Sequence, residues 1–252
     1  MEEDLDPQHY GVSPALLWEW RVPRLGSENP QKLKSKVCEW LVYSRLSAYA
    51  ATQMITEGSP LDEGPTWSFD RFGQSVTALP DGRTIYIGRE HEDYYDQDFH
   101  IYNDVVVLHP DRTVDFYCYK KSDFPPTDFH TATLVDETIV IIGSLGYPDE
   151  RNWKDTPIYL LSLDNLEIHK VESSGISPGW IHDHHATLSE DKNSIILTKG
   201  KVQIGEGYFL SENIDDWKLN LDDWSWDRLN HVSCSRRGRS YTILRSQRVI
   251  MA

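Results

Sequence analysis

The sequence predicts a mainly β fold made of three consecutive four-stranded units, which is the organisation of a small propeller. One observation is a strand pair that occurs three times, within residues 74–88, 129–143 and 184–200: an alternating strand, a tight acidic turn, and an aliphatic strand that leads to a glycine. The copies recur about every fifty residues, a period typical of repeat architectures such as propellers. The other observation is that two more short strands follow each pair, and four short strands form one propeller blade.

Residues 1–66 are expected to form an N-terminal cap of one strand and one helix. The first thirteen residues are acidic and polar, so we expect them to be frayed. Residues 16–22 alternate large apolar and charged side chains, which favours a half-buried strand. Asn29 and Pro30 are typical of a helix start, and apolar residues at three- and four-residue spacing predict one amphipathic helix over residues 31–56 that packs on the β body.

Residues 67–230 are expected to hold the three repeats, at about 67–121, 122–176 and 177–230. In each repeat an aliphatic third strand follows the strand pair, and a fourth strand with aromatic or alternating side chains follows the third. Inner strands of a blade are buried on both faces and outer strands on one, which explains this order. The third strands are predicted at 102–108, 157–163 and 216–221, and the fourth strands at 114–119, 166–171 and 224–229.

The last segment, residues 231–252, is basic, whereas the rest of the chain is acidic. It contains five arginines and no acidic residue. We interpret it as a closing strand or tail that lies on the acidic body, and the alternative is a tether for an acidic partner. Residues 16–22 and 224–229 share a Trp-x-Trp pattern, so we also expect these two strands to pair across a closure.

The charge of the chain favours a basic protein as its partner. The 252 residues include 40 acids and 25 bases, for a net charge of −15. A surface of this charge disfavours nucleic acid and anionic membranes as partners. We therefore expect neither a nucleic-acid nor a membrane interaction.

The cysteines and the hydropathy pattern indicate a reduced, cytoplasmic setting. Cys38, Cys118 and Cys234 are too few and too scattered for a disulfide framework or a zinc site. The chain begins with acidic residues where a secretory signal is basic and then apolar, and no segment reaches eighteen apolar residues.

Several marks of the repeats resemble kelch-type repeat proteins. They are the His/Gln-x-Ala/Val-Thr opening, the aliphatic strand that ends in glycine, the Tyr-Asn-Asp before the third strand at 102–104, and the aromatic residues of the fourth strand. Segments 90–96, 124–130 and 178–181 are also similar to a group of bacterial kelch-like proteins. The resemblance covers about two thirds of the chain and implies a propeller of three recognisable blades, partial or closed by the termini. Kelch units usually carry a glycine pair where this chain has Gly88-Arg89, Gly143-Ser144 and Lys199-Gly200.

The segment between the second and third strands of the first repeat is the first choice for a partner surface. Tyrosines and acids together on a loop are what protein-binding surfaces use, with aromatic anchors surrounded by charge. The predicted contact residues are Glu90, His91, Glu92, Asp93, Tyr94, Tyr95, Asp96 and Asp98. A solvated loop whose acids accept hydrogen bonds from backbone N–H groups explains the same composition.

A divalent metal site is the alternative interpretation of this segment. Carboxylates suit calcium or magnesium, and imidazoles with a carboxylate suit zinc, iron or manganese. The candidate metal ligands are His91, His100, His182 and His185. His184 occupies the same repeat position as His130 and Gln74, so we expect it to have a structural role in packing.

Two hypotheses of function follow, and a non-catalytic protein-binding module without a cofactor is the preferred one. A bacterial immunity protein that neutralises a basic toxin is one concrete case. The alternative is a metal-dependent enzyme or metal-binding protein that uses the Glu90–His100 segment with His182 and His185. No nucleophile elbow, phosphate-binding loop or other catalytic motif occurs. A structural domain normally joined to other domains is a third possibility.

Overall fold

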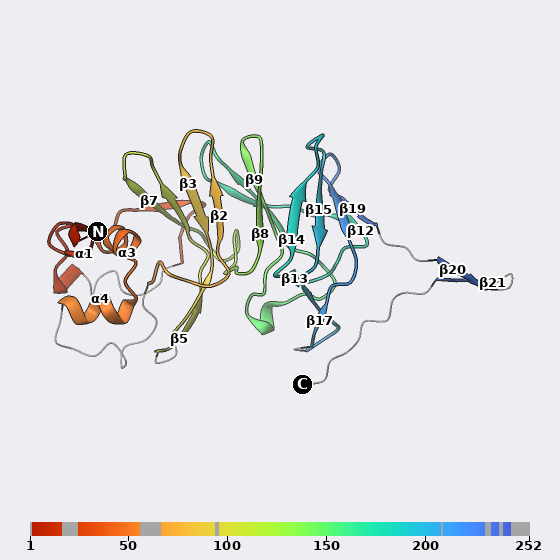
Figure 1. Cartoon of the computed structure of the whole chain (residues 1–252), viewed down its shortest axis with the longest axis horizontal. Coiled ribbons are helices and arrows are strands. Elements are labelled where there is room, and N and C mark those ends of the chain that lie inside the picture. Colours follow the sequence, from red (N-terminus) through yellow and green to blue (C-terminus); the bar gives the residue numbers. More distant parts are fainter. Residues whose placement is uncertain are drawn as a thin grey trace. The chain divides into compact units, whose positions relative to one another are not determined.

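The computed structural model describes residues 2–16, 25–55, 67–93, 96–207, 209–229, 233–236 and 239–242. They form a mainly β structure of antiparallel sheets with a few short helices (Figure 1). The chain divides into two compact units, Met1–Asp128 and Phe129–Ala252. No helix in the described parts of the chain is long and apolar enough to cross a membrane.

The first unit contains a five-stranded sheet in the order β1-β7-β6-β3-β2. Four of its strands form an antiparallel meander, in which each strand pairs with the next of the four. They are β2 (Ser75–Ala78), β3 (Thr84–Ile87), β6 (Val105–Leu108) and β7 (Val114–Cys118). The inner strands β3 and β6 are aliphatic and pair in the register Ile85↔Val107. Both residues are buried, as expected for inner strands covered on both faces.

The helix predicted over residues 31–56 is wrong in its extent. Residues Gln31–Leu33 form a strand, β1, that pairs with β7. Two helices follow it, α3 at Lys36–Ser44 and α4 at Ala48–Ile55. Asn29 and Pro30 therefore precede a strand and do not start a helix.

The boundaries of α3 are set by two residues that the apolar spacing does not reveal. Ser35 is the N-cap, and its hydroxyl oxygen accepts a hydrogen bond from the backbone N–H of Cys38 at 3.1 Å. Arg45 ends the helix in a left-handed conformation (φ 58°), and its backbone N–H donates to the carbonyl of Leu41. The helix period therefore breaks between α3 and α4 without a glycine or a proline.

Helix α3 packs on the β sheet, as predicted. Its residues Val37, Trp40 and Leu41 are buried in one core cluster with Val106 and Phe116 of the sheet. Trp40 is fully buried, and burial of a large apolar side chain contributes about 2–3 kcal/mol to stability.

The N-terminal segment is ordered, so the prediction that it is frayed is wrong for the described residues 2–13. Residues Glu2–Leu5 form a short helix, α1. The indole N–H of Trp40 donates to the carbonyl of Leu5 at 3.3 Å, and Val12 is 7% exposed within the core cluster of α3. The segment is mostly acidic and polar, so its composition gave no sign of these few buried contacts.

Among the described residues, the second unit contains two larger, mainly antiparallel sheets, a small three-stranded sheet, and a two-stranded sheet in the C-terminal segment. One sheet has the order β11-β10-β9-β8, and its strands are β8 (Thr131–Val135), β9 (Thr138–Ile142), β10 (Ile158–Ser162) and β11 (Ile168–Lys170). The other has the order β12-β19-β18-β15-β14, and its strands are β12 (Ser174–Gly175), β14 (His185–Leu188), β15 (Ser194–Thr198), β18 (Trp217–Asn220) and β19 (Ser225–Arg228). The small sheet joins β13 (Ile181–His182), β16 (Lys201–Gln203) and β17 (Leu210–Glu212). The predicted third and fourth strands of all three repeats are thus present.

One core cluster joins the two larger sheets of the second unit. Val140 and Ile142 of β9 are buried in it together with Ile195 and Leu197 of β15. Trp217 also belongs to this cluster. The aliphatic inner strands that the sequence singled out are therefore the strands that bury the core.

The strands at the sheet edges differ from the prediction. Residues 16–22 were expected to pair with 224–229, but β12 pairs in parallel with β19 at Ser225 and Trp226, and β1 takes the corresponding place beside β7. Of residues 16–22, only Leu16 lies within the described residues. In the basic C-terminal segment, β20 (Ser233–Arg236) and β21 (Arg239–Thr242) form a two-stranded sheet with each other, which the sequence did not predict.

Candidate functional site

The predicted partner-binding segment is a β-hairpin. Strands β4 (Glu90–Asp93) and β5 (Asp96–Ile101) pair in the register Glu90↔Ile101 and His91↔His100, with an irregularity between His91 and Asp93 (Figure 1). The expected solvated loop is therefore replaced by paired strands. Tyr94 and Tyr95 lie outside the described residues, as do the side chains of residues 92, 93 and 96–98.

Backbone pairing fixes the base of the hairpin. Glu90 and Phe72 exchange two backbone hydrogen bonds, of 2.9 and 3.1 Å, and the N–H of Tyr102 donates to the carbonyl of Arg89 at 2.8 Å. Phe72 is 62% exposed and Phe99, on β5, is 44% exposed. Two large aromatic side chains are therefore exposed on or beside this hairpin.

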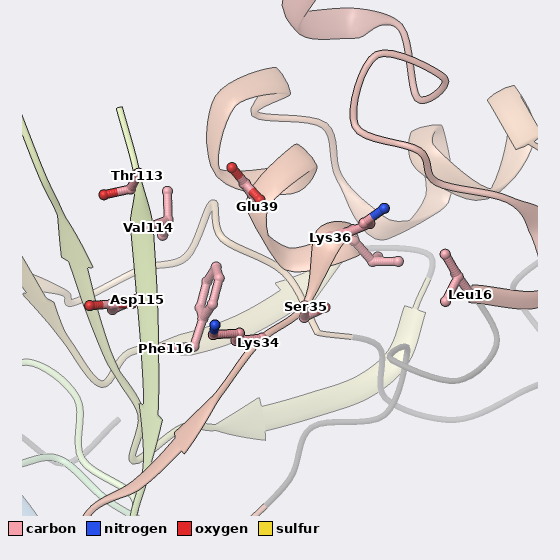
Figure 2. A pocket seen from close by; sticks show the side chains of 10 residues that line it. Leu16, Lys34, Ser35, Lys36, Glu39, Thr113, Val114, Asp115 and Phe116 are labelled. Atoms are coloured by element: carbon pink, nitrogen blue, oxygen red, sulfur yellow. The ribbon is translucent and has the colours of Figure 1, made fainter. Parts of the chain in front are cut away.

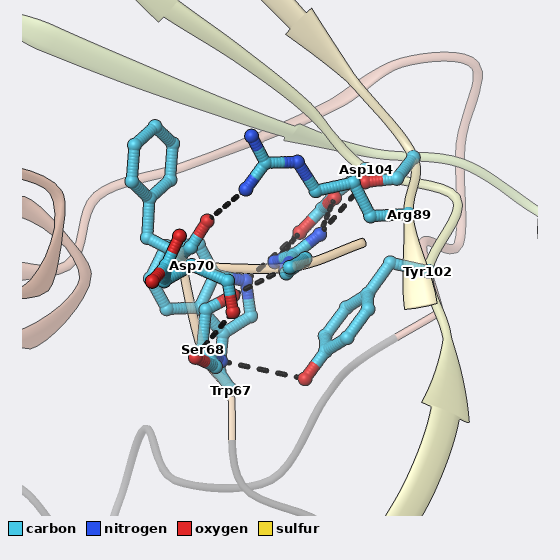
Figure 3. A network of polar contacts seen from close by, with 9 residues as sticks. Trp67, Ser68, Asp70, Arg89, Tyr102 and Asp104 are labelled. Carbon is cyan, nitrogen blue, oxygen red and sulfur yellow. Dashed lines mark hydrogen bonds and ion pairs between the residues drawn. The ribbon is translucent and has the colours of Figure 1, made fainter. Parts of the chain in front are cut away.

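A buried polar network lies next to this base (Figure 3). The carboxylate of Asp104 accepts two hydrogen bonds from the guanidinium of Arg71, at 2.7 and 2.8 Å, and one from the indole N–H of Trp67 at 2.8 Å. The guanidinium also stacks on the ring of Tyr102, 3.4 Å from its centroid. Burial acts to lower the pKa of Arg71, but the charge of Asp104 raises it above its usual value, so this side chain stays charged.

This network fixes the backbone where β6 begins. The sequence did not predict it. Asp104 directly precedes β6, and Asn103 donates hydrogen bonds from Nδ2 to the carbonyls of Tyr119 (2.9 Å) and Phe124 (2.7 Å). The Tyr-Asn-Asp pattern was a visible signal, but no local pattern reveals Arg71 as the partner of Asp104. Because each guanidinium nitrogen of Arg71 donates to an acceptor, the arrangement holds the chain in place and leaves no group for chemistry.

Two of the candidate metal ligands, His91 and His100, lie opposite each other on the hairpin. Residues directly opposite in an antiparallel pair point to the same face. His91 is buried, and its Nδ1 lies 3.4 Å from the carbonyl oxygen of Asp70. His100 packs edge-on against Tyr102, with 4.8 Å between the centroids, and burial together with the charge of Arg71 lowers its pKa.

The other two candidate ligands, His182 and His185, lie in the second unit. His182 is 5% exposed on β13, and neither of its ring nitrogens has a hydrogen-bond partner among the described residues. Burial lowers its pKa to about 4. His185 is exposed on β14, opposite Thr198. Among the residues that the structure describes, no three His, Cys, Asp or Glu side chains cluster so that they could hold a metal ion.

His184 has the structural role that its repeat position predicted. It is buried, and its Nε2 lies 2.9 Å from the hydroxyl oxygen of Thr131, which is the first residue of β8. The contact links the first strands of the two larger sheets in the second unit. A Cβ at Gly143 would come within 2.8 Å of the His184 ring, so glycine is required there for this packing.

Each meander is interrupted between its second and third strands, and each interruption carries an exposed aromatic residue. We name them insertion 1 (residues 88–104), insertion 2 (143–157) and insertion 3 (199–216). Insertion 1 contains the β4–β5 hairpin, insertion 2 the 3₁₀ turn Pro148–Glu150, and insertion 3 the β16–β17 hairpin. The exposed aromatic residues are Phe99 (44%), Trp153 (37%) and Phe209 (65%).

Hydrogen bonds brace insertions 2 and 3 from within the second unit. The indole N–H of Trp180 donates to the carbonyl of Leu145 at 3.0 Å, and Arg151 Nε donates to the same carbonyl at 2.8 Å. The N–H of Gln203 in insertion 3 donates to the carbonyl of Trp180 at 3.0 Å. Trp180 thus connects the two insertions. Trp153 and Phe209 were not predicted as contact residues, although each is an aromatic residue within a polar stretch.

A cavity of about 700 Å³ lies between the start of α3 and strand β7 in the first unit (Figure 2). Basic and acidic side chains balance around it, and the hydroxyl of Ser35 is already used as the N-cap of α3. Lys32 lies 2.8 Å from the carboxylate of Asp115, and it holds the pKa of that carboxyl low against the opposing effect of burial. The lining residues are Leu16, Lys34, Ser35, Lys36, Val37, Glu39, Thr113, Val114, Asp115 and Phe116.

The fold and the three insertions define a mainly β protein of interrupted four-stranded meanders. No known family model matches the sequence. A stretch of 120 residues is 24% identical to Dynein regulatory complex subunit 7 of Chlamydomonas reinhardtii. The matched stretch covers 46% of this chain and 9% of that protein. The chain thus spans about a tenth of the length of this curated relative.

Proposed function

We propose that this protein is a non-catalytic protein-binding module that presents its three insertions to a partner, the β4–β5 hairpin first. The observation that carries the proposal is the exposed aromatic residue in every insertion: Phe99, Trp153 and Phe209. Aromatic side chains on rigid elements are typical anchors of protein interfaces. The three four-stranded meanders also support the proposal that the body is a small kelch-like propeller.

The proposed partner is a basic protein, and a toxin neutralised by an immunity protein is one concrete case. The net charge of −15 supports it, because opposite charge steers association and raises the association rate. The acids of insertion 1 concentrate this charge beside its aromatic residues. The proposed contacts there are Glu90, Glu92, Asp93, Tyr94, Tyr95, Asp96 and Asp98. His91 is buried, so we expect it to support the hairpin from beneath.

Substitution of an anchor tests the proposal. Binding of the full chain to proteins from its own cell is measured by pull-down at low and high salt, and the captured partner is then titrated. Phe99→Ala is expected to weaken binding about tenfold or more, since removal of a central aromatic anchor costs about 2 kcal/mol. Tyr49→Ala is the matched control, because Tyr49 on α4 has the same exposure of 44%.

Two outcomes would reject this function. One is capture of no partner whose binding weakens with salt, because the acidic surface requires this dependence. The other is an equal loss of affinity in Phe99→Ala and Tyr49→Ala, which would show that insertion 1 is not the contact.

The second candidate function is metal binding by insertion 1, and the His91–His100 pair is the observation that favours it. Two imidazoles on one face of a hairpin suit zinc or another transition metal. The sequence also offered His182 and His185 as ligands, but they lie in the second unit, so the described residues support only the His91–His100 pair. Elemental analysis of the purified protein would support it if about one equivalent of metal were found and were lost in both His91→Ala and His100→Ala while the fold was retained.

A further inference from the structure

Arg89 is a buried guanidinium without a carboxylate partner. Arg89 is 8% exposed. Its guanidinium donates one hydrogen bond among the described residues, to the backbone carbonyl of Phe69 (Figure 3). No ion pair reaches it within the described residues, and its Nε has no hydrogen-bond partner there. Buried charges are normally paired, so this one is unusual.

The backbone at Arg89 also favours a different residue. Its φ is 110°, in the region that glycine adopts readily and other residues avoid. Backbone hydrogen bonds hold this conformation, because the N–H of Arg89 donates to Thr127 and its carbonyl accepts from Tyr102, both at 2.8 Å. An arginine is therefore kept at a position where glycine would relieve strain, and such strain is concentrated at functional sites.

A second arginine without a carboxylate lies over the same aromatic ring. The guanidinium carbon of Arg45 is 4.4 Å from the centroid of Phe69, and that of Arg89 is 5.6 Å from it. Arg45 is exposed, and no ion pair is found for it among the described residues. Arg112 offers a comparison, since it stacks on Tyr43 at the same 4.4 Å but is paired with the carboxylate of Asp4 at 2.5 Å.

The charges around Phe69 do not balance. Arg45, Arg71 and Arg89 are positive, and Asp104 is committed to Arg71 by two hydrogen bonds. The exposed Asp70 acts on Arg89 only at longer range, since no ion pair joins them. Two guanidinium groups thus lie near one aromatic ring, and no carboxylate among the described residues forms an ion pair with either.

We propose that Arg45 and Arg89 form a binding site for an oxyanion, namely the carboxylate or phosphate group of a small molecule. Guanidinium groups bind both anions through paired hydrogen bonds, and the Nε of Arg89 is a buried donor with no acceptor among the described residues. In this site the exposed Arg45 contacts the anion from the solvent side, and the buried Arg89 donates to it from the protein interior. The ring of Phe69 and the backbone around Arg89 hold both side chains in place. Arg89 lies at the base of insertion 1, but the site uses none of the contact residues proposed for the protein partner.

The test is a titration of the full chain observed by NMR at the arginine Nε–Hε groups. Sodium acetate and sodium phosphate are added separately, with sodium chloride used to hold the ionic strength constant. Arg89→Lys identifies the Arg89 resonance, which is expected to shift and saturate with acetate, with phosphate, or with both. The anion that saturates at lower concentration distinguishes a carboxylate ligand from a phosphate ligand.

Substitutions then separate this site from general charge effects. Arg45→Ala is expected to weaken anion binding about tenfold, because a charge-assisted hydrogen bond is lost. Arg112→Ala is the matched control and is expected to bind the anion as the unchanged protein does. Asp70→Asn removes the nearest competing carboxylate and is expected to bind more tightly.

The proposal is overturned if neither anion gives a saturable shift at Arg89. It is also overturned if Arg112→Ala loses as much affinity as Arg45→Ala. Because Arg45, Arg112 and Asp70 are all exposed, these variants are expected to fold, and the test does not depend on the buried position.

Discussion

The Arg71–Asp104 pair shows how one buried ionic contact can fix a whole segment. The two side chains are 33 positions apart, and both are at most 8% exposed. Desolvation of both charges is costly, and the two parallel hydrogen bonds together with the Trp67 N–H offset that cost. The pair therefore contributes specificity to the place where β6 begins.

Removal of one partner of this pair is expected to be strongly destabilising. Asp104→Ala leaves the guanidinium of Arg71 buried and uncompensated, so we expect the free energy of unfolding to fall by about 3–5 kcal/mol. Urea denaturation followed by circular dichroism measures the change. Glu172→Ala, which breaks the exposed Lys170–Glu172 pair, is the control and is expected to cost less than about 1 kcal/mol.

A cost below about 1 kcal/mol for Asp104→Ala would contradict the anchoring role. The sequence made Asp104 visible through the Tyr-Asn-Asp pattern but gave no sign of Arg71. A single-chain pattern reports local spacing, whereas this pair depends on how the loop before β2 folds back on the sheet.

At the scale of elements, helix boundaries show what apolar spacing can and cannot predict. The spacing predicted a helix with a buried face, and α3 and α4 are both present. Their separation depends on the Ser35 cap and on the left-handed Arg45, and neither changes the apolar period. Caps and single backbone conformations therefore decided the boundaries.

Ser35 is expected to contribute measurably to the stability of the first unit. Ser35→Ala removes the acceptor for the Cys38 N–H, and we expect a loss of about 1 kcal/mol in the free energy of unfolding. Urea denaturation provides the measurement. Ser35→Thr retains the hydroxyl acceptor and is expected to lose clearly less. Equal losses in the two variants would show that packing at this buried position, and not the cap, is responsible.

The strands were predictable because their inner members are continuous aliphatic runs. The β4–β5 hairpin was not, because the Glu-His-Glu-Asp sequence of β4 lacks the apolar alternation of a half-buried strand. The edge strands β1 and β12 are three and two residues long, too short for any period to appear. The sequence therefore located the segment of insertion 1 without revealing its structure.

At the scale of the whole molecule, the three repeats and the strong negative charge follow from patterns that extend over many residues. The repeats were visible because every meander needs the same buried inner strands. The histidines of the second unit were less predictable, because their effect depends on burial. His130, His182 and His184 are each 5–7% exposed.

These three histidines are expected to make the second unit sensitive to acid. Burial lowers the pKa of His130 and of His182 to about 4, and burial with the charges of neighbouring histidines lowers that of His184 to about 3, from an ordinary value of 6.5. Between pH 6.5 and pH 4 the unfolded chain therefore binds more protons than the folded one, so stability is fully present above pH 6.5 and is lost as the pH falls. At pH 5 one such histidine accounts for about 2 kcal/mol.

Hydrogen exchange of residues 131–198 at pH 7 and pH 5, corrected for the intrinsic exchange rate, measures this loss. His182→Gln removes one titrating group and is expected to reduce the loss of protection by about 1–2 kcal/mol. His185→Gln is the control, because His185 is exposed on the neighbouring strand, and its loss is expected to equal that of the unchanged protein. If His182→Gln loses as much protection between pH 7 and pH 5 as the unchanged protein, His182 is not the group whose protonation destabilises the second unit. The prediction depends on burial, because burial is what lowers the pKa of this imidazole.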